Sequence, residues 1–217
     1  MNKIIKSKEL IQLYKKGYFP MAEDAFSSEI SFYKPEKRFI IPINSFHIPK
    51  KLFNEFKKNK YQFVINRNFH AVIKNCARIK RISNETWINQ IIIDTFIELH
   101  KEGYAKSIEC YLERELVGGL YGLHIGGCFF GESMFSSISN VSKLCLLFLI
   151  SILLKEKFIL LDSQFYNPHL LQFGAYEISN TEYQEKLKNG INKKNVFLEN
   201  YNHQESISIL HSISHKS

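Results

Sequence analysis

KSIECYLERELVGGLYGLHIGGCFFG, residues 106–131, is the stretch of this sequence that decides the fold. It contains three apolar segments: Lys106–Leu112, Leu116–Ile125 and Cys128–Gly131. The expected turns between these segments are Glu113-Arg114 and Gly126-Gly127. Extended apolar segments joined by such short polar or glycine turns are typical of antiparallel hairpins. The stretch therefore predicts three consecutive antiparallel strands.

Helices are expected on both sides of this meander. Upstream, Asn68–Ile79 and Thr86–Glu102 each carry apolar residues at helical spacing. Downstream, Ser142 can cap a buried helix that runs to about Lys157, and Phe158–Asp162 then forms a short buried strand that ends in a carboxylate. This order of elements predicts an α+β fold with an antiparallel-rich central sheet flanked by helices. It is the order found in GNAT-type acyltransferases, an analogy of fold that says little about chemistry.

The ends of the chain differ from this central part. Four of the five prolines lie in the first 50 residues, which favours short strands and turns there, after a short helix at Lys8–Lys16. A basic stretch, Lys50–Lys60, precedes a strand at Tyr61–Ile65. We therefore expect a small N-terminal domain over residues 1–60, a larger domain over residues 61–190, and a polar, loosely attached C-terminal tail over residues 191–217.

Composition excludes several classes of protein. The longest apolar run, Leu144–Leu154, is far shorter than the roughly 20 residues that a membrane span needs. The first residues have no continuous apolar core, so no secretory signal is expected. The four cysteines form no C-x-x-C pair and have apolar neighbours, which indicates reduced, buried thiols in a cytoplasmic protein and no metal site. The net charge of +8 suits a polyanionic partner, and equally suits plain solubility.

Two stretches in and after the meander differ from an ordinary core. Val117–Gly122 holds three glycines, which indicate a bulge or a close approach by another backbone or a ligand; the alternative is a turn-rich strand without a ligand. Gly131–Ser136 is expected at a strand-to-helix junction, where polar groups collect. Its Glu132 is a candidate site residue, and the alternative is a solvated charge.

Asp162 and Gln164 form a third candidate, where the buried strand ends. Positions two apart in an extended chain point to the same face, so the two side chains should stand side by side. The amide carbonyl of Gln164 can accept a hydrogen bond from an attacking amine, and a neighbouring carboxylate can orient the amide or take up proton charge. The alternative is that Asp162 caps the turn that follows.

Trp87 and the basic residues leave two interpretations open. The single tryptophan can be a core residue or a platform on which a base stacks. The clusters at Lys50–Lys60 and at Arg78, Lys80 and Arg81 can be solvated faces or can follow a phosphate backbone. The scattered histidines do not form a Ser/His/Asp order.

Taken in chain order, these motifs identify a resemblance. They include Gly17-Tyr-Phe-Pro-Met21, Thr86-Trp-Ile88, Leu116-Val-Gly-Gly-Leu-Tyr-Gly122, Gly131-Glu-Ser-Met-Phe-Ser136, Ser142-Lys143, Asp162-x-Gln164 and Gly174-Ala175. In these motifs the chain closely resembles leucyl/phenylalanyl-tRNA–protein transferases, from about residue 10 to residue 187. The combination G-G-x-Y-G followed by G-E-S-M-F-S is highly specific to that family.

The resemblance implies an aminoacyltransferase that moves Leu or Phe, and Met less well, from aminoacyl-tRNA to the N-terminal Lys or Arg of a protein. The product is an N-degron that marks the protein for degradation. Because the ester is already activated, no ATP, metal or other cofactor is implied. The implied partners are leucyl-tRNA and phenylalanyl-tRNA, through the acceptor stem and the 3′ adenosine, and proteins with N-terminal Lys or Arg. We expect a GNAT-like aminoacyl-transferase domain at residues 61–190 and a cytoplasmic monomer.

The resemblance also implies roles for single residues. Gln164 matches the glutamine that orients the acceptor's α-amino group, Asp162 its supporting carboxylate, and Glu132 the glutamate beside the bound aminoacyl-adenosine. Trp87 matches a tryptophan near that adenosine. The positions that match the lining of the Leu or Phe pocket are Leu120, Phe129, Met134, Leu149 and Leu161.

The chain departs from the family pattern at several positions. Phe32-Tyr33-Lys34-Pro35 stands where the family has a Trp-rich segment, so Tyr33 is the expected stacking residue there, and Arg38 is retained. Leu149 stands where a larger aromatic residue can occur, and the segment ahead of the first helix is reduced. The alternatives to this function are another aminoacyl-tRNA-dependent transferase, such as one of the peptidoglycan-bridge type, and a non-catalytic tRNA-binding protein.

Overall fold

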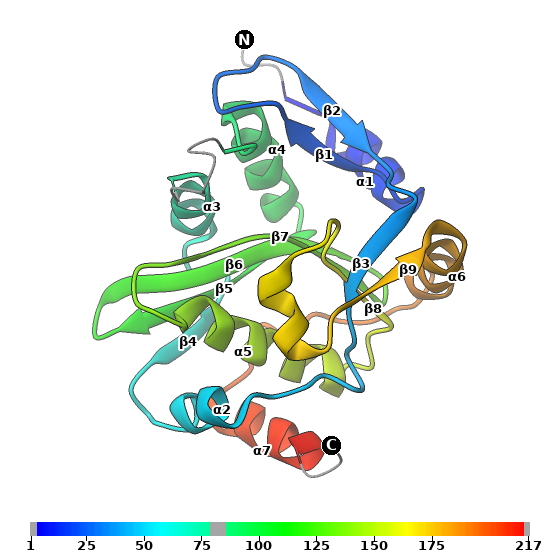
Figure 1. Cartoon of the computed structure of the whole chain (residues 1–217). Coiled ribbons are helices and arrows are strands. Elements are labelled where there is room, and N and C mark those ends of the chain that lie inside the picture. Colours follow the sequence, from blue (N-terminus) through cyan, green and yellow to red (C-terminus); the bar gives the residue numbers. More distant parts are fainter. Residues whose placement is uncertain (1–3, 79–85, 215–217) are drawn as a thin grey trace.

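A computed structural model describes residues 4–78 and 86–214 of the chain. Its helices are α1 (Ser7–Lys15), α2 (Lys50–Phe56), α3 (Phe69–Arg78), α4 (Gln90–Lys101), α5 (Val141–Lys155), α6 (Asn180–Ile191) and α7 (His203–Ser214), with a short 3₁₀ helix, η1, at Pro168–Phe173. Its strands are β1 (Phe19–Ala22), β2 (Ile30–Tyr33), β3 (Lys37–Ile41), β4 (Gln62–Ile65), β5 (Ala105–Leu112), β6 (Glu115–Ile125), β7 (Cys128–Ser136), β8 (Leu160–Asp162) and β9 (Tyr176–Ser179). Figure 1 shows their arrangement.

One mixed sheet forms the centre of the described structure. Seven strands lie in the order β4-β5-β6-β7-β8-β3-β9, while β1 and β2 pair separately as a hairpin. Neighbours in the large sheet are antiparallel, except β7 and β8, which are parallel and are connected through α5. The expected α+β fold with its antiparallel meander is therefore confirmed, and the sheet is mixed because a helix separates β7 from β8.

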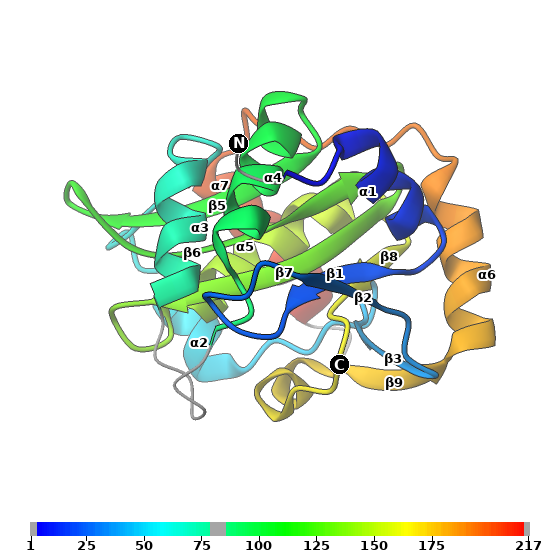
Figure 2. The same cartoon turned by 90° about the horizontal axis from the view of Figure 1, so that it is seen from above.

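Helices cover both faces of this sheet (Figure 1). On one face, apolar residues of α2, α5 and α7 share a core that includes Leu52, Leu147 and Leu210. On the other, α1, α3, α4 and α6 share a second core that includes Leu10 and Phe96. Figure 2 views the molecule from the side of α1 and α4. No helix among the described residues is long and apolar enough to cross a membrane.

The glycines of β6 permit a bulge between β6 and β7. The register pairs Tyr121 with Ser133 but Gly122 with Gly131, so Glu132 is the extra residue of β7. A Cβ on Gly122 would lie 2.3 Å from the carbonyl oxygen of Phe130, a distance that no side chain tolerates. The bulge predicted from the glycine-rich stretch is thus confirmed, and it re-aims Glu132 out of the regular alternation of the strand.

The segment around Glu132 differs from the expected strand-to-helix junction. Strand β7 continues to Ser136 because its backbone pairs with β6 as far as Gly118. Helix α5 begins only at Val141, after Asn140 in the left-handed conformation; the Asn140 side chain does not cap it, and the backbone N–H of Ser142, inside the first turn, donates to Ser136 Oγ at 3.3 Å. The prediction that Ser142 caps this helix is therefore wrong.

Helix α4 also begins later than expected. It begins at Gln90, and the Asn89 side chain accepts a hydrogen bond from the backbone N–H of Ile92 at 2.9 Å. Such a cap satisfies a backbone N–H that has no partner within the helix. Thr86, the expected first residue of the helix, lies in the loop before α4. The loop places Trp87 beside the sheet instead of in the first turn of a helix.

The two ends of the chain contribute to the same cores as its middle. Strand β3, from the first 60 residues, lies inside the large sheet between β8 and β9. After residue 191, Phe197, Tyr201 and Leu210 are buried, and α7 packs on α5. The expectation of a loosely attached tail is therefore wrong, because a few apolar residues among many polar ones are enough to dock α7. The four cysteines are buried and free, as predicted.

Candidate active site

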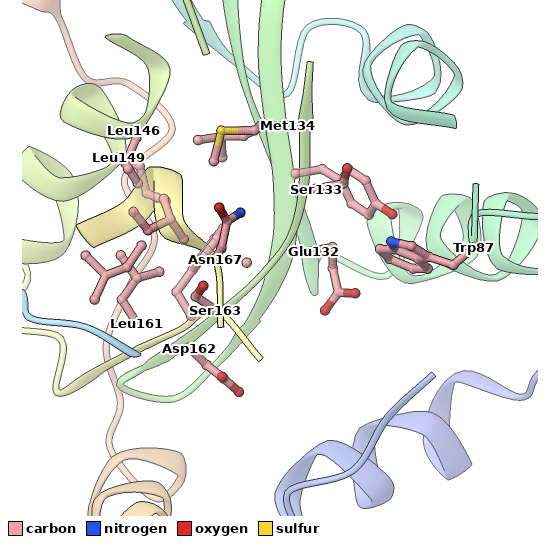
Figure 3. Close-up of a pocket in the computed structure, with 16 residues that line it drawn as sticks. Trp87, Glu132, Ser133, Met134, Leu146, Leu149, Leu161, Asp162, Ser163 and Asn167 are labelled. Carbon is pink, nitrogen blue, oxygen red and sulfur yellow. The ribbon is translucent and has the colours of Figure 1, made fainter. Parts of the chain in front are cut away.

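A pocket of about 390 Å³ lies where β6, β7 and β8 meet α5 and η1. Figure 3 shows its lining, with Leu146, Leu149 and Leu161 together on one side and Glu132 and Trp87 on the other. The lining residues are Ile41, Trp87, Leu120, Tyr121, Phe129, Gly131, Glu132, Ser133, Met134, Leu146, Leu149, Leu161, Asp162, Ser163, Asn167 and Leu170. The pocket therefore has an apolar part and a polar part that lie next to each other.

Helix α5 and the strand ends form the apolar part. Leu146 and Leu149 are three residues apart, so both project from the same face of α5. Phe129 and Leu161 are paired across the parallel strands β7 and β8 and are almost fully buried. Such a wall offers no hydrogen-bonding group, so it favours an aliphatic or aromatic guest.

Glu132 and Gln164 form the centre of the polar part. The Gln164 amide nitrogen donates to Glu132 Oε1 at 3.0 Å, and the Tyr14 hydroxyl donates to the same oxygen at 2.7 Å. Glu132 Oε2 is buried and has no hydrogen-bond partner among the described residues. A buried polar atom left without a partner is costly, so this oxygen is a site where a polar group of a ligand would be stabilised.

Asp162 has a different environment, because it is fully buried in an ion pair. Its carboxylate accepts three hydrogen bonds from the Arg38 guanidinium: from Nε to Oδ1 at 2.8 Å, from Nε to Oδ2 at 3.1 Å, and from Nη2 to Oδ2 at 2.6 Å. The Tyr183 hydroxyl donates to Oδ2 and the Gln164 backbone N–H donates to Oδ1, each at 2.8 Å. These donors occupy the lone-pair positions of an ionised carboxylate, so Asp162 acts as an anchor.

Burial shifts the pKa values of three groups at this site. Burial raises the pKa of Glu132 to about 8, although the hydrogen bonds from Tyr14 and Gln164 oppose that shift. Desolvation also raises the pKa values of Tyr14 and Tyr183 well above the usual range, so both phenols stay protonated donors at neutral pH. Paired carboxyl groups with different environments are typical of functional sites.

Most of the candidate residues predicted from the sequence meet at this pocket. The lining includes Trp87, Leu120, Phe129, Glu132, Met134, Leu149, Leu161 and Asp162. Gln164 contacts it through Glu132. Asp162 and Gln164 are adjacent, but not by strand alternation: Gln164 has φ +67°, and its backbone turns back onto the Asp162 carboxylate.

Tyr33 is not part of this pocket lining. It lies on β2, it is 42% exposed, and its ring centroid is 6.0 Å from that of Phe165, the residue after Gln164. Phe165 is also exposed, so these two rings form an aromatic surface next to the polar part of the site. Of the basic residues, Lys80 and Arg81 lie outside the described residues.

Sequence reasoning did not find Tyr14, Tyr183, Leu146, Leu170 or Asn167 as site residues. Tyr14 and Glu132 are 118 positions apart, so only the packing of α1 on the sheet brings them together. Tyr183 looks like an ordinary core residue of α6. The one available signal was the apolar face of α5, since Leu146 is one turn before the predicted Leu149.

The chain is similar to a family of known proteins. A family model described as leucyl/phenylalanyl-tRNA protein transferase matches residues 40–188. The leucyl/phenylalanyl-tRNA–protein transferase of Maricaulis maris is 44% identical over 83% of this chain and 84% of that protein. The one of Chlorobaculum tepidum is 38% identical over 90% of this chain and 100% of that protein. Among solved structures, L-PGS from Bacillus licheniformis is similar with a TM-score of 0.39, at 13% identity over 83% of this chain and 62% of that chain.

Proposed function

Because this chain belongs to the leucyl/phenylalanyl-tRNA–protein transferase family, we propose that it moves Leu or Phe, and Met less well, from aminoacyl-tRNA to the N-terminal Lys or Arg of a protein. The product is an N-degron. The observation that carries this proposal is the apolar wall of the pocket directly beside the Glu132–Gln164 pair. An apolar side chain and a reacting polar group can be held there at the same time.

The reaction needs positioning more than strong acid–base chemistry. The α-amino nitrogen of the acceptor attacks the ester carbonyl carbon, a C–N bond forms, and the C–O bond to the ribose of the terminal adenosine breaks. The amine loses a proton and the departing ribose oxygen gains one, so the reaction is balanced without an added reagent. Holding the amine and the ester together supplies much of the rate enhancement in reactions of this kind.

Gln164 is the proposed catalytic residue and Asp162 its support. The amide oxygen of Gln164 has no hydrogen-bond partner among the described residues, so it can accept a hydrogen bond from the attacking amine. Asp162, held by Arg38, fixes the backbone of Gln164 through its N–H. The proposed role of Asp162 is therefore to orient Gln164, since its own oxygens already accept hydrogen bonds.

The remaining candidate residues contact the donor. Leu120, Phe129, Met134, Leu149 and Leu161 are proposed to surround the Leu or Phe side chain. Glu132 and Trp87 are proposed to lie beside the aminoacyl-adenosine, with the indole ring available for stacking. Tyr33, with Phe165, is proposed to stack on a part of the tRNA end outside the pocket.

We also propose a GNAT-type fold for the larger part of the chain. The meander β5–β7, followed by α5 and the parallel strand β8, supports a GNAT-type acyltransferase fold for residues 61–190. We further propose a cytoplasmic monomer that binds the acceptor stem through its basic residues, an interaction that added salt should weaken.

The test is transfer of radiolabelled Phe or Leu from charged tRNA to peptides that begin with Lys, Arg, Asp or Ala. We expect label on the Lys and Arg peptides alone. Gln164→Ala should lower transfer by about a hundredfold, the usual order for one lost hydrogen-bonding group in a preorganised site, and should keep charged-tRNA binding.

Two other outcomes of the transfer experiment would each indicate one of the rival functions. Label on a cell-wall precursor instead of the peptides would indicate a transferase of the peptidoglycan-bridge type. Binding of charged tRNA with no transfer to any acceptor would indicate a tRNA-binding protein.

A further inference from the structure

The amide of Gln164 has one end that donates hydrogen bonds and one that accepts them. Only the oxygen can accept a hydrogen bond from an amine, and the NH₂ group would repel the amine's hydrogens. The two ends are nearly equal in size, so the shape of the site cannot select between them. The hydrogen-bond partners of the amide must therefore determine which end faces the substrate.

Glu132 provides the hydrogen-bond partner that determines which end of the Gln164 amide faces the substrate. Its Oε1 accepts from Gln164 Nε2 at 3.0 Å, which leaves the amide oxygen of Gln164 without a partner among the described residues. Oε1 also accepts from the Tyr14 hydroxyl, so a proton bound to Glu132 would lie on Oε2, which has no partner among the described residues. Oε1 therefore presents only an acceptor to Gln164 in either ionisation state, and it can bind the NH₂ end of the amide and not the oxygen end. For this selection to work, the carboxyl group of Glu132 must itself stay in one orientation.

Tyr14 supplies that constraint. Its hydroxyl donates to Glu132 Oε1 at 2.7 Å, and the residue is fully buried on α1. The Tyr14 ring packs edge-on against Phe130, with ring centroids 5.1 Å apart. The chain after α1 is tied to the same network, because Gly17 O accepts a hydrogen bond from Arg38 Nη1 at 3.0 Å. The hydroxyl group thus has little freedom to move away from Glu132.

We propose that Tyr14 is a positioning residue, which acts through Glu132 to hold the Gln164 amide with its nitrogen on Glu132 and its oxygen toward the substrate amine. This inference rests on the proposed function and deepens it, since it assigns a role to a hydroxyl group on a helix outside the pocket lining. Without that hydroxyl, Glu132 keeps one donor instead of two, and its carboxyl group can rotate. The amide can then turn over, and turned-over molecules are inactive.

Tyr14 also influences the ionisation of Glu132, which gives a second readout. Its hydrogen bond lowers the pKa of the Glu132 carboxyl, against the larger effect of burial. Removal of the hydroxyl should therefore raise that pKa further above its value of about 8. The other titratable groups around Glu132 and Tyr14 are Arg38 on β3, Tyr121 on β6, Asp162 on β8 and Tyr183 on α6.

The experiment compares transfer of Phe to a Lys-initiated peptide by the wild type, Tyr14→Phe, Glu132→Ala and the double variant. Tyr14→Phe keeps the buried ring and removes only the hydroxyl. We expect its kcat to fall by about tenfold or more, with the KM for charged tRNA within about twofold, because orientation and not binding is affected. In the Glu132→Ala background the Tyr14 substitution should cause no further loss. Independent losses that multiply would overturn the inference.

A matched control exists on β5. Tyr111 also donates its hydroxyl to a buried carboxylate, Glu109 Oε2, at 2.8 Å, but it lies outside the pocket. Tyr111→Phe should keep the wild-type kcat. An equal loss in Tyr111→Phe would attribute the effect to general stability, and an unchanged kcat in Tyr14→Phe would refute the inference directly.

A titration by NMR tests the contact without any activity. In protein labelled with ¹³C at glutamate carboxyl carbons, the signal absent from Glu132→Gln identifies Glu132. Its midpoint should move to higher pH in Tyr14→Phe and stay unchanged in Tyr111→Phe. An unchanged midpoint in Tyr14→Phe would refute the contact. A wild type that transfers nothing would refute the proposed function, whereas a normally active Tyr14→Phe variant would refute only the role of Tyr14.

Discussion

At the scale of single residues, the two carboxyl groups of the site differ in their hydrogen-bond partners. Asp162 is buried against a guanidinium, whereas Glu132 is buried with two neutral donors and one free oxygen. Burial raises the pKa of the Glu132 carboxyl to about 8, whereas Asp162 is held in an ion pair with Arg38. The two residues can therefore support different tasks although they lie in the same pocket.

The raised pKa of Glu132 predicts an unusual dependence of stability on pH. The carboxyl group has a pKa near 4.5 in the unfolded chain and about 8 in the fold, so the folded state binds the proton more tightly. Its contribution to the free energy of unfolding is fully present below pH 4.5 and is lost as the pH rises toward 8. Urea denaturation of the wild type and Glu132→Gln over this range measures it. The difference in free energy between them should change with pH, and a constant difference would contradict the prediction.

At the scale of elements, the bulge between β6 and β7 connects the fold to the site. Gly122 allows the two backbones to approach closely, and the extra residue that results is Glu132. The glycine-rich motif and the glutamate that follows it therefore belong to the same β-bulge. Bulges next to active sites commonly redirect a side chain in this way.

Gly122→Ala should therefore affect stability and transfer together. Its Cβ would meet the Phe130 carbonyl oxygen at 2.3 Å and the Phe129 ring at 2.4 Å, which forces β6 and β7 apart. We expect a loss of at least about 3 kcal/mol in the free energy of unfolding, as for severe overpacking, and a large loss of transfer. Gly103→Ala is the control: it meets no atom within 4 Å, and its positive φ of +83° should cost only about 1 kcal/mol. If denaturation showed the same loss of unfolding free energy in Gly122→Ala and Gly103→Ala, the clash would be ruled out.

The sequence predicted the elements whose signal is local and missed those that depend on distant packing. The meander, α5 and β8 were predictable, because apolar runs and turn residues mark them directly. The extension of β7 to Ser136 and the docking of α7 were not, since Gly131–Ser136 is polar in part and α7 shows only scattered apolar residues. In the same way, Asp162 and Gln164 were predictable from a motif, whereas Tyr14 and Tyr183 reach the site through tertiary contacts alone.

At the scale of the whole molecule, α7 closes the core on the side of α5 opposite the sheet. Helix α5 is buried along almost its full length, so it needs cover on both sides. Leu210 on α7 is fully buried, and the hydroxyl groups of Ser151 on α5 and Ser206 on α7 are 2.6 Å apart. The C-terminal helix is therefore a structural part of the domain that holds the pocket.

Leu210→Ala should lower the free energy of unfolding by about 2–5 kcal/mol, the usual cost of a large cavity in a core. Transfer by the folded variant at low temperature should stay near the wild-type rate, because α7 does not line the pocket. Ser208→Ala, at an exposed position of the same helix, should change stability by less than about 0.5 kcal/mol. A Leu210→Ala variant as stable as the wild type would mean that α7 is not docked in solution.

The place of β3 in the sheet has a consequence for how the protein is made. Strand β3 leaves the ribosome early, but its neighbours β8 and β9 are among the last strands to emerge. Arg38 of β3 therefore stays unpaired until Asp162 has been synthesised, more than a hundred residues later. Pairing between such distant segments is slow compared with local folding. A nascent chain consequently cannot assemble the candidate active site before β8 has been synthesised, because Asp162 and Gln164 follow Arg38 by more than a hundred residues.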